Sequence, residues 1–121
     1  MTDFRALEGS RTIASDKVEG TAVYNREGEK LGTISRFMVD KLSGKVDYAE
    51  LSFGGLFGLG QDHYPLPWDV LRYDPDQSGY VIDLDKDFLK EAPRYSADQQ
   101  QVYDDAYGRQ VYGYYNVPWP Y

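Results

Sequence analysis

The glycine-rich segment 54–60 and the one histidine, His63, are the residues of this chain that most readily suggest chemistry. A glycine-rich loop can present backbone amides to phosphates, but a phosphate-binding loop ends in Gly-Lys-Ser or Gly-Lys-Thr. Here Gln61 and Asp62 follow the last glycine, and the Gly-x-Gly-x-x-Gly spacing of dinucleotide-binding loops is absent. The apolar residues of the segment are Leu56, Phe57 and Leu59. We therefore predict a structural loop whose apolar side chains pack on the protein or contact a partner.

His63 would need a nucleophile and an orienting carboxylate to act as a catalytic base. Asp62 and Asp69 are close to it in the sequence and Ser52 is a candidate neighbour in space, but no motif joins them. As a zinc ligand it would stand with carboxylates alone, which makes a poor zinc site. A small-ligand-binding or hydrolase-like site around His63 is therefore kept as the alternative function. The expectation is a surface histidine in a protein that is not an enzyme and binds no cofactor or metal.

Alternating acidic residues occur twice, and each pattern has a structural explanation. The segment 74–79 resembles the start of a calcium loop, but the twelfth position is Asp85 instead of glutamate and the flanks are typical of strands. Asp83 and Asp87 flank Asp85 at a predicted strand-to-helix junction, where capping and the helix dipole favour acidic residues. We predict a hairpin turn over 74–79 and no catalytic carboxylate pair.

Composition narrows the function classes further. The 121-residue chain has 13 basic and 20 acidic side chains, and the resulting net charge of −7 disfavours binding to nucleic acid or to anionic membranes. It has no cysteine, which excludes disulfides, thiolate metal sites and a cysteine nucleophile. No apolar run reaches the about 20 residues of a membrane span, and the N-terminus lacks a secretory signal. We expect a cytoplasmic protein without an integral membrane segment; peripheral association with a membrane complex stays open.

The order of apolar runs and turns predicts small antiparallel strands. They are expected at 18–24, 30–40, 45–53, 63–67 and 80–84, with 68–73 continuing the barrel through one helical turn. In the third strand, Ala49 and Leu51 are placed on the core face, and Tyr48 and Glu50 on an amphipathic face. This alternation predicts one face toward the core and one amphipathic face.

Helical signals are confined to the C-terminal part. Asp85 is expected to cap a helix over 86–92 that Pro93 stops, and a second helix is expected from 96–98 to Tyr107, ending at Gly108. Seven tyrosines and one tryptophan fall between Tyr95 and Tyr121. Such side chains suit interfaces, whereas single-strand nucleic-acid binding would also need a basic lining. The tail is expected to pack on its own barrel, on a second subunit or on another protein, and the sequence leaves these open.

The strand and turn segments contain five motifs. They are Gly20-x-x-Val23-Tyr24, Gly28-Glu29-Lys30-Leu31-Gly32, Asp40-Lys41-Leu42-Ser43-Gly44-Lys45-Val46, Phe53-Gly54-Gly55-Leu56-Phe57-Gly58-Leu59-Gly60 and Pro65-x-Pro67-Trp68-x-x-Leu71. Together they resemble the PRC-barrel family over about 16–93, and the ending resembles stand-alone bacterial members. The resemblance implies a small, partly open β-barrel. Relatives include the H subunit of the photosynthetic reaction centre and a ribosomal-RNA maturation factor, but we expect neither the membrane helix of the first nor the N-terminal domain of the second in this chain. Neither role is carried over, and no catalytic residue is implied.

The sequence thus predicts an all-β fold: a small, partly open antiparallel β-barrel with a short C-terminal helical segment and an aromatic tail. Residues 1–15 are expected to form an N-terminal arm, 16–93 the barrel and 94–121 the tail. The function expected is that of a non-enzymatic protein-interaction or adaptor module, with a protein partner of unknown identity and a homodimer as the expected assembly. The residues expected to make the contacts are Leu56, Phe57, Leu59, Trp68, Tyr112, Tyr114, Tyr115 and Trp119.

Overall fold

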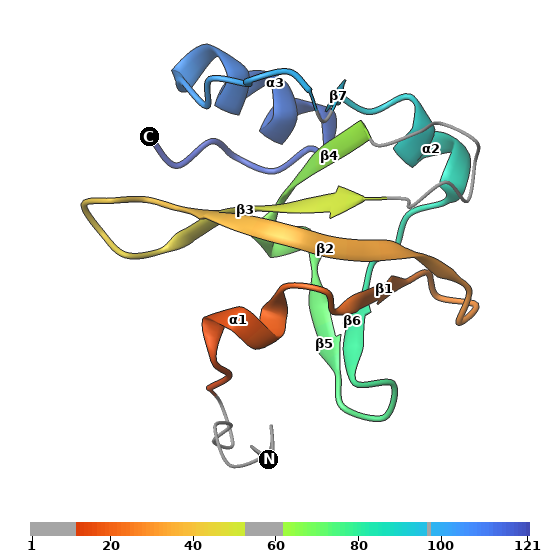
Figure 1. The fold of residues 1–121 in the computed structure, drawn as a ribbon. Coiled ribbons are helices and arrows are strands. Elements are labelled where there is room, and N and C mark those ends of the chain that lie inside the picture. The colour runs from red at the N-terminus through yellow and green to blue at the C-terminus, as the bar shows by residue number, and fades with distance from the viewer. Residues whose placement is uncertain (1–11, 53–61, 97) are drawn as a thin grey trace.

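The computed structural model describes residues 12–52, 62–96 and 98–121, and the strands of these ranges form one open sheet (Figure 1). The strands are β1 Ala22–Tyr24, β2 Lys30–Val39, β3 Val46–Ser52, β4 Asp62–Pro67, β5 Arg72–Asp74, β6 Gly79–Val81 and β7 Tyr95–Ser96. Their order across the sheet is β5-β6-β1-β2-β3-β4-β7. This arrangement confirms the predicted small, partly open barrel. The prediction of purely antiparallel pairing is wrong at one place, because β1 and β6 pair in parallel.

Local hydrogen bonds define the long β2–β3 hairpin. The Asp40 carboxylate accepts a hydrogen bond from the backbone N–H of Ser43 at 2.9 Å, and the N–H of Asp40 donates to the carbonyl of Lys45 at 2.8 Å. Gly44 has a φ of 78°, a left-handed conformation that glycine adopts without strain. The hairpin extends beyond the rest of the sheet (Figure 1). It confirms the strands predicted over 30–40 and 45–53.

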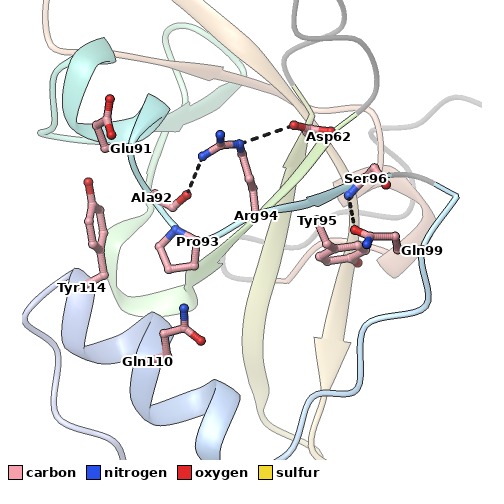
Figure 2. Close-up of a pocket in the computed structure, with 10 residues that line it drawn as sticks. All are labelled: Asp62, Glu91, Ala92, Pro93, Arg94, Tyr95, Ser96, Gln99, Gln110 and Tyr114. Carbon is pink, nitrogen blue, oxygen red and sulfur yellow. Dashed lines mark hydrogen bonds and ion pairs between the residues drawn. The ribbon is translucent and has the colours of Figure 1, made fainter.

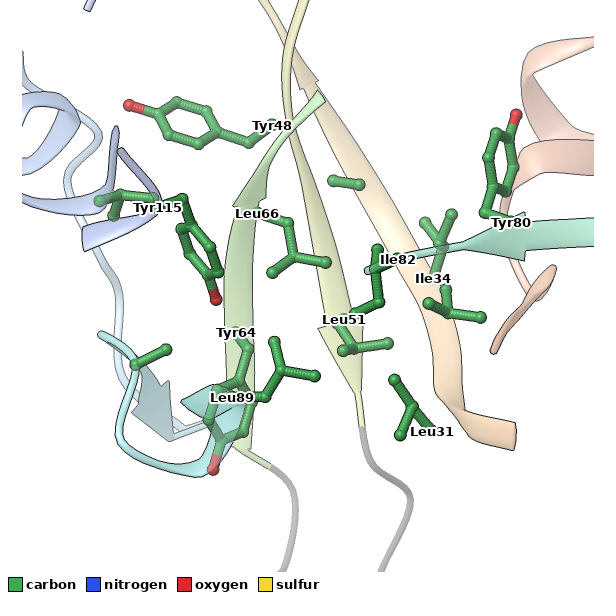
Figure 3. Close-up of a cluster of buried hydrophobic side chains, with 14 of the residues drawn as sticks. Leu31, Ile34, Tyr48, Leu51, Tyr64, Leu66, Tyr80, Ile82, Leu89 and Tyr115 are labelled. Atoms are coloured by element: carbon green, nitrogen blue, oxygen red, sulfur yellow. The ribbon is translucent and has the colours of Figure 1, made fainter. Parts of the chain in front are cut away.

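The core lies against the central strands, with side chains from both the sheet and the C-terminal region (Figure 3). Leu51, Tyr64 and Leu66 of β3 and β4 are fully buried, together with Leu89 of α2, which spans Lys86–Lys90. Residues 48–51 are buried without a break, so both faces of β3 are covered. The face that was predicted to be amphipathic is therefore buried as well in this part of the strand.

The N-terminal elements differ in part from the prediction. Residues Ser15–Val18 form the short helix α1, and Val18 is buried, so the strand predicted from 18 begins only at Ala22. After β4, Trp68–Val70 form the 3₁₀ turn η2, which confirms the predicted helical turn before β5. The predicted turn over 74–79 connects β5 to β6. The strand predicted over 80–84 is shorter, since β6 ends at Val81.

The C-terminal helix starts later than predicted. The helix α3 spans Asp105–Tyr114 and begins at Asp104, whose carboxylate accepts a hydrogen bond from the N–H of Tyr107 at 2.9 Å. The predicted start at 96–98 is wrong, because Ser96 belongs to β7, a strand that the sequence did not indicate. The predicted end at Gly108 is also wrong. By contrast, Asp85 caps α2 as predicted, accepting from the N–H of Phe88 at 2.7 Å.

Candidate functional site

The residues predicted to make contacts divide into three groups. Leu56, Phe57 and Leu59 lie outside the described residues. Trp68 is half-buried in η2 and its ring packs edge-on against Tyr80, with ring centroids 5.6 Å apart. The remaining predicted residues belong to α3 and to the chain that follows it. Their contact role stays a prediction, and the structure describes their packing.

Tyr112 and Tyr115 are buried in the protein's own core. The hydroxyl of Tyr112 donates a hydrogen bond to the backbone carbonyl of Asp47 at 2.6 Å, which ties α3 to the start of β3. Tyr114 is half-buried, and its hydroxyl donates to the carbonyl of Phe88 in α2. Helix α3 thus presents little free aromatic surface. Its aromatic side chains hold the helix on the sheet.

Trp119 packs against α3 where the helix has a glycine. A Cβ atom placed on Gly108 would lie 2.2 Å from the Trp119 ring, so any larger side chain would displace the tryptophan. The ring also contacts Tyr112 and Tyr121, with centroids 4.9 and 5.2 Å apart. The absence of a side chain at Gly108 therefore creates the seat in which the C-terminal tail is held.

An open groove of about 530 Å³ lies between this tail and the turn end of the β2–β3 hairpin. We call it the hairpin-end groove. It is lined by Met38, Val39, Asp40, Lys41, Asp47, Tyr48, Tyr103, Asp105, Trp119 and Tyr121. Its floor is apolar and aromatic, while three carboxylates and one ammonium group stand around it. Tyr121 closes one side, where its hydroxyl donates a hydrogen bond to Asp47 at 2.9 Å.

Two polar atoms beneath the groove have no hydrogen-bond partner among the described residues, the hydroxyl of Tyr48 and the indole N–H of Trp119. Tyr48 is only 3% exposed, and burial raises the pKa of its phenol. A buried donor without a partner costs about 1–3 kcal/mol. The packing of the tail over the groove is therefore energetically imperfect.

A different arrangement surrounds Glu50, which is fully buried on β3. Arg36 lies directly across from it on β2, and its Nε donates to the carboxylate at 2.7 Å. The hydroxyls of Tyr95 and Tyr103 both donate to the second carboxylate oxygen. Arg36 also donates to the hydroxyl of Tyr95 at 3.2 Å. Residues from two strands of the hairpin, from β7 and from the segment before α3 thus meet at one carboxylate.

This cluster keeps Glu50 ionised. Burial by itself raises the pKa of the carboxyl, but the hydrogen bonds from Tyr103, Tyr95 and Arg36 together outweigh that effect and hold the pKa below its usual value. Burial and the bond to Glu50 raise the pKa of Tyr103, so this phenol stays protonated and remains a donor. The four groups form a satisfied network. Sequence reasoning missed it because Arg36, Glu50, Tyr95 and Tyr103 are far apart in the chain.

His63 lies on β4, half-buried, opposite Ser52 in the strand pairing. Its Nδ1 is 3.4 Å from the hydroxyl of Ser35, and its ring is tilted against that of Tyr95. Within the described ranges, no carboxylate is hydrogen-bonded to the imidazole, and no group of three or more acidic or histidine side chains is placed to hold a metal ion. The contacts of His63 are those of a structural residue packed beside the Glu50 network.

A second, polar groove of about 680 Å³ lies between α2, β7 and α3 (Figure 2). Its main charged group is Arg94, whose Nε lies 3.5 Å from the Asp62 carboxylate and whose terminal nitrogen donates to the carbonyls of Lys90 and Ala92. On its floor, the N–H of Ser96 donates to the side-chain oxygen of Gln99 at 3.0 Å. Four of the polar residues that line the groove, Asp62, Arg94, Ser96 and Gln99, thus bond to one another or to the backbone.

The comparisons with known proteins agree with this architecture. The family model of the PRC-barrel domain matches residues 11–89. A protein of Deinococcus radiodurans that is described as uncharacterized is 32% identical over 81 residues, which is 66% of this chain and 28% of the relative. The chain thus spans less than a third of that relative. Across the described residues, no helix is long and apolar enough to cross a membrane. On the strength of the family match and the open seven-stranded sheet, the chain belongs to the PRC-barrel domain family.

Proposed function

We propose that this chain is a non-enzymatic protein-interaction module that contacts its partner through the hairpin end of the sheet. The observation that carries the proposal is the distribution of exposed apolar side chains. In the described part, five large hydrophobic residues are exposed, and three of them, Val39, Leu42 and Tyr121, lie at this end. Leu42 at the hairpin tip is 97% exposed. Apolar groups that gather on one surface of a soluble protein are typical of an interaction site.

The aromatic tail contributes to this surface in two ways. Trp119 and Tyr121 line the hairpin-end groove directly. Tyr112 and Tyr115, which are buried, support the groove from inside by fixing α3 on the sheet. The predicted contact role of the tail is therefore narrowed to its last residues.

Two features support a binding role over an enzymatic one. The oxygens of Glu50 already bond to Arg36, Tyr95 and Tyr103, which leaves the carboxylate little capacity to act on a substrate. Within the part of the chain that the structure describes, His63 contacts the hydroxyl of Ser35 and the ring of Tyr95 and has no hydrogen bond to the carboxylate that would orient a catalytic base. A binding module is consequently the better account of these residues.

Site-specific photocrosslinking in the source cells tests the proposal. A photoreactive phenylalanine analogue replaces Leu42 in one strain and Glu27, an exposed residue of the β1–β2 turn, in another. We expect a discrete protein adduct from position 42 and none from position 27. Equal adducts at both positions, or none at position 42, would contradict the proposed surface.

The alternative of a ligand or hydrolase site around His63 has its own test. The substitution His63→Ala is expected to leave the position-42 adduct unchanged. If the adduct persists but a hydrolytic activity of the protein is lost on this substitution, the enzymatic alternative replaces the proposal.

A further inference from the structure

The tip of the β2–β3 hairpin has the composition of a docking segment. Leu42 projects into solvent and is flanked by Lys41 and Lys45, both exposed. Within the described residues neither lysine forms an ion pair. Leu42 and both lysines thus belong to the turn that joins β2 to β3. The hairpin that ends in this turn extends beyond the rest of the sheet (Figure 1).

The hairpin-end groove has the complementary composition. Its floor is formed by apolar and aromatic side chains, among them Met38, Val39 and Trp119. Around that floor stand three carboxylates, from Asp40, Asp47 and Asp105, against the single ammonium group of Lys41. The groove thus fits an apolar side chain that carries positive charges on either side, which is the chemistry of the tip.

The tip does not fill the groove of its own chain. The backbone bonds between Asp40 and Lys45 and from Gly44 to Asp40 close the turn, and Leu42 makes almost no contact with the rest of the molecule. A second copy of the chain is free of this restriction. Since each copy carries both a tip and a groove, two copies related by a two-fold axis make the same contact twice.

We propose that two copies of this chain associate through their hairpin ends, with Leu42 of each copy in the hairpin-end groove of the other. Lys41 and Lys45 of one copy then lie beside the carboxylates of Asp40, Asp47 and Asp105 of the other. The inference rests on the proposed interaction surface and names its occupant. The assembly is a homodimer in which the hairpins cross side by side.

The net charge of −7 opposes association only at long range. At physiological ionic strength, charges further apart than about 8 Å are largely screened, so groups in contact decide the sign of the interaction. The dimer has two equivalent contacts, and in each of them a basic tip lies in an acidic groove. A small interface of this kind is expected to be weak and concentration-dependent.

Analytical ultracentrifugation of the full chain over a wide range of concentrations tests the inference. We expect a monomer–dimer equilibrium for the natural sequence, and an at least tenfold weaker association for Leu42→Ser, because each dimer loses two buried leucines. The matched control is Tyr73→Ser, which removes an exposed apolar side chain on β5, away from the hairpin. It should associate as the natural protein does.

A charge exchange makes the test specific for tip and groove. In one variant Lys41→Asp and Lys45→Asp reverse the tip; in the other, Asp105→Lys reverses part of the groove. Each variant alone should associate at least tenfold more weakly than the natural protein. Their mixture should form the dimer again, because the reversed tip meets the reversed groove. In the second contact the natural basic tip meets a groove that Lys41→Asp makes more acidic, so this contact stays complementary.

Three results would overturn the inference: a natural protein that stays monomeric up to about 0.5 mM, a dimer that Leu42→Ser does not weaken, or a mixture that gains nothing over its components. None of these alone removes the proposed function. If position 42 crosslinks to a protein of a different mass while the chain stays monomeric, the surface holds and its occupant is another protein.

Discussion

The Glu50 network and the hairpin-end groove both lie on β2 and β3, but they differ in how their polar groups are bonded and how their apolar groups are buried. Around Glu50, the fully buried carboxylate accepts hydrogen bonds from Arg36, Tyr95 and Tyr103. Around the groove, apolar side chains remain exposed and two buried donors have no partner among the described residues. The contrast indicates a structural role for the first region and supports the contact role that we propose for the second.

Removing the carboxylate should have the largest effect on the fold. Glu50→Ala leaves the hydroxyls of Tyr95 and Tyr103 without their acceptor and opens a cavity beside them. We expect a loss of about 3 kcal/mol in the free energy of unfolding, measured by urea denaturation. A loss below about 1 kcal/mol would mean that the network does not hold the C-terminal segment on the sheet.

The substitution Gly108→Ala should disturb the hairpin-end groove and leave the Glu50 network intact. Alanine favours a helix over glycine by about 1 kcal/mol, but here its Cβ collides with the Trp119 ring. We expect the tail to leave its seat, with a red-shifted tryptophan emission and a net loss of stability of about 1–2 kcal/mol. The Glu50 network should survive this change.

The matched control is Gly113→Ala in the same helix. A Cβ on Gly113 meets no atom within 4 Å, so the helix preference acts alone. This variant should gain about 0.5–1 kcal/mol and keep the natural emission spectrum. Equal effects from both alanines would show that Trp119 does not depend on Gly108.

Because Glu50 is ionised in the folded protein, the stability that it contributes should depend on pH. Its pKa is lowered in the fold, so the stability it contributes is present above the pKa of an unfolded glutamate, about 4.3, and is lost as pH falls through the lower folded value. The stability difference between the natural protein and Glu50→Gln should therefore shrink as the pH is lowered below about 4. Urea titrations at pH 7 and pH 3 measure it. A difference that is constant with pH would contradict an ionised Glu50.

Leu42→Ser should have the smallest effect on the fold. Because the side chain is 97% exposed, the free energy of unfolding should change by no more than about 0.5 kcal/mol. Thermal unfolding at low protein concentration, where any dimer dissociates, measures it. A larger loss would place Leu42 in the packing of the monomer and weaken its assignment to the surface.

Local sequence signals predicted the elements that depend on local bonds. Asp85 capped α2 as expected, and the turn at Asp40–Lys45 formed the predicted hairpin. The helix near the C-terminus was misplaced because several residues there are good caps: Ser96, Asp98 and Asp104 all qualify, and only tertiary packing selects the last. Gly108, which normally indicates a helix end, lies inside α3 because Trp119 occupies the space of a side chain.

Local sequence patterns could not predict the Glu50 network. Alternation along β3 correctly placed Glu50 and Tyr48 on the face opposite Ala49 and Leu51, but it could not indicate what covers that face. The cover comes from Tyr95 and Tyr103, about fifty residues later in the chain. The one available signal was a glutamate between Ala49 and Leu51, and it fits an exposed face equally well.

The ends of the sheet limit how this protein can meet others. Among the described residues its outermost strands are β5 and β7, of three and two residues, so each offers only a few backbone N–H and C=O groups for pairing with a foreign strand. Edge-to-edge addition, the route by which open sheets polymerise, therefore finds only short templates at these two strands. A partner that approaches the sheet at β5 or β7 consequently gains little from backbone pairing and depends on side-chain contacts.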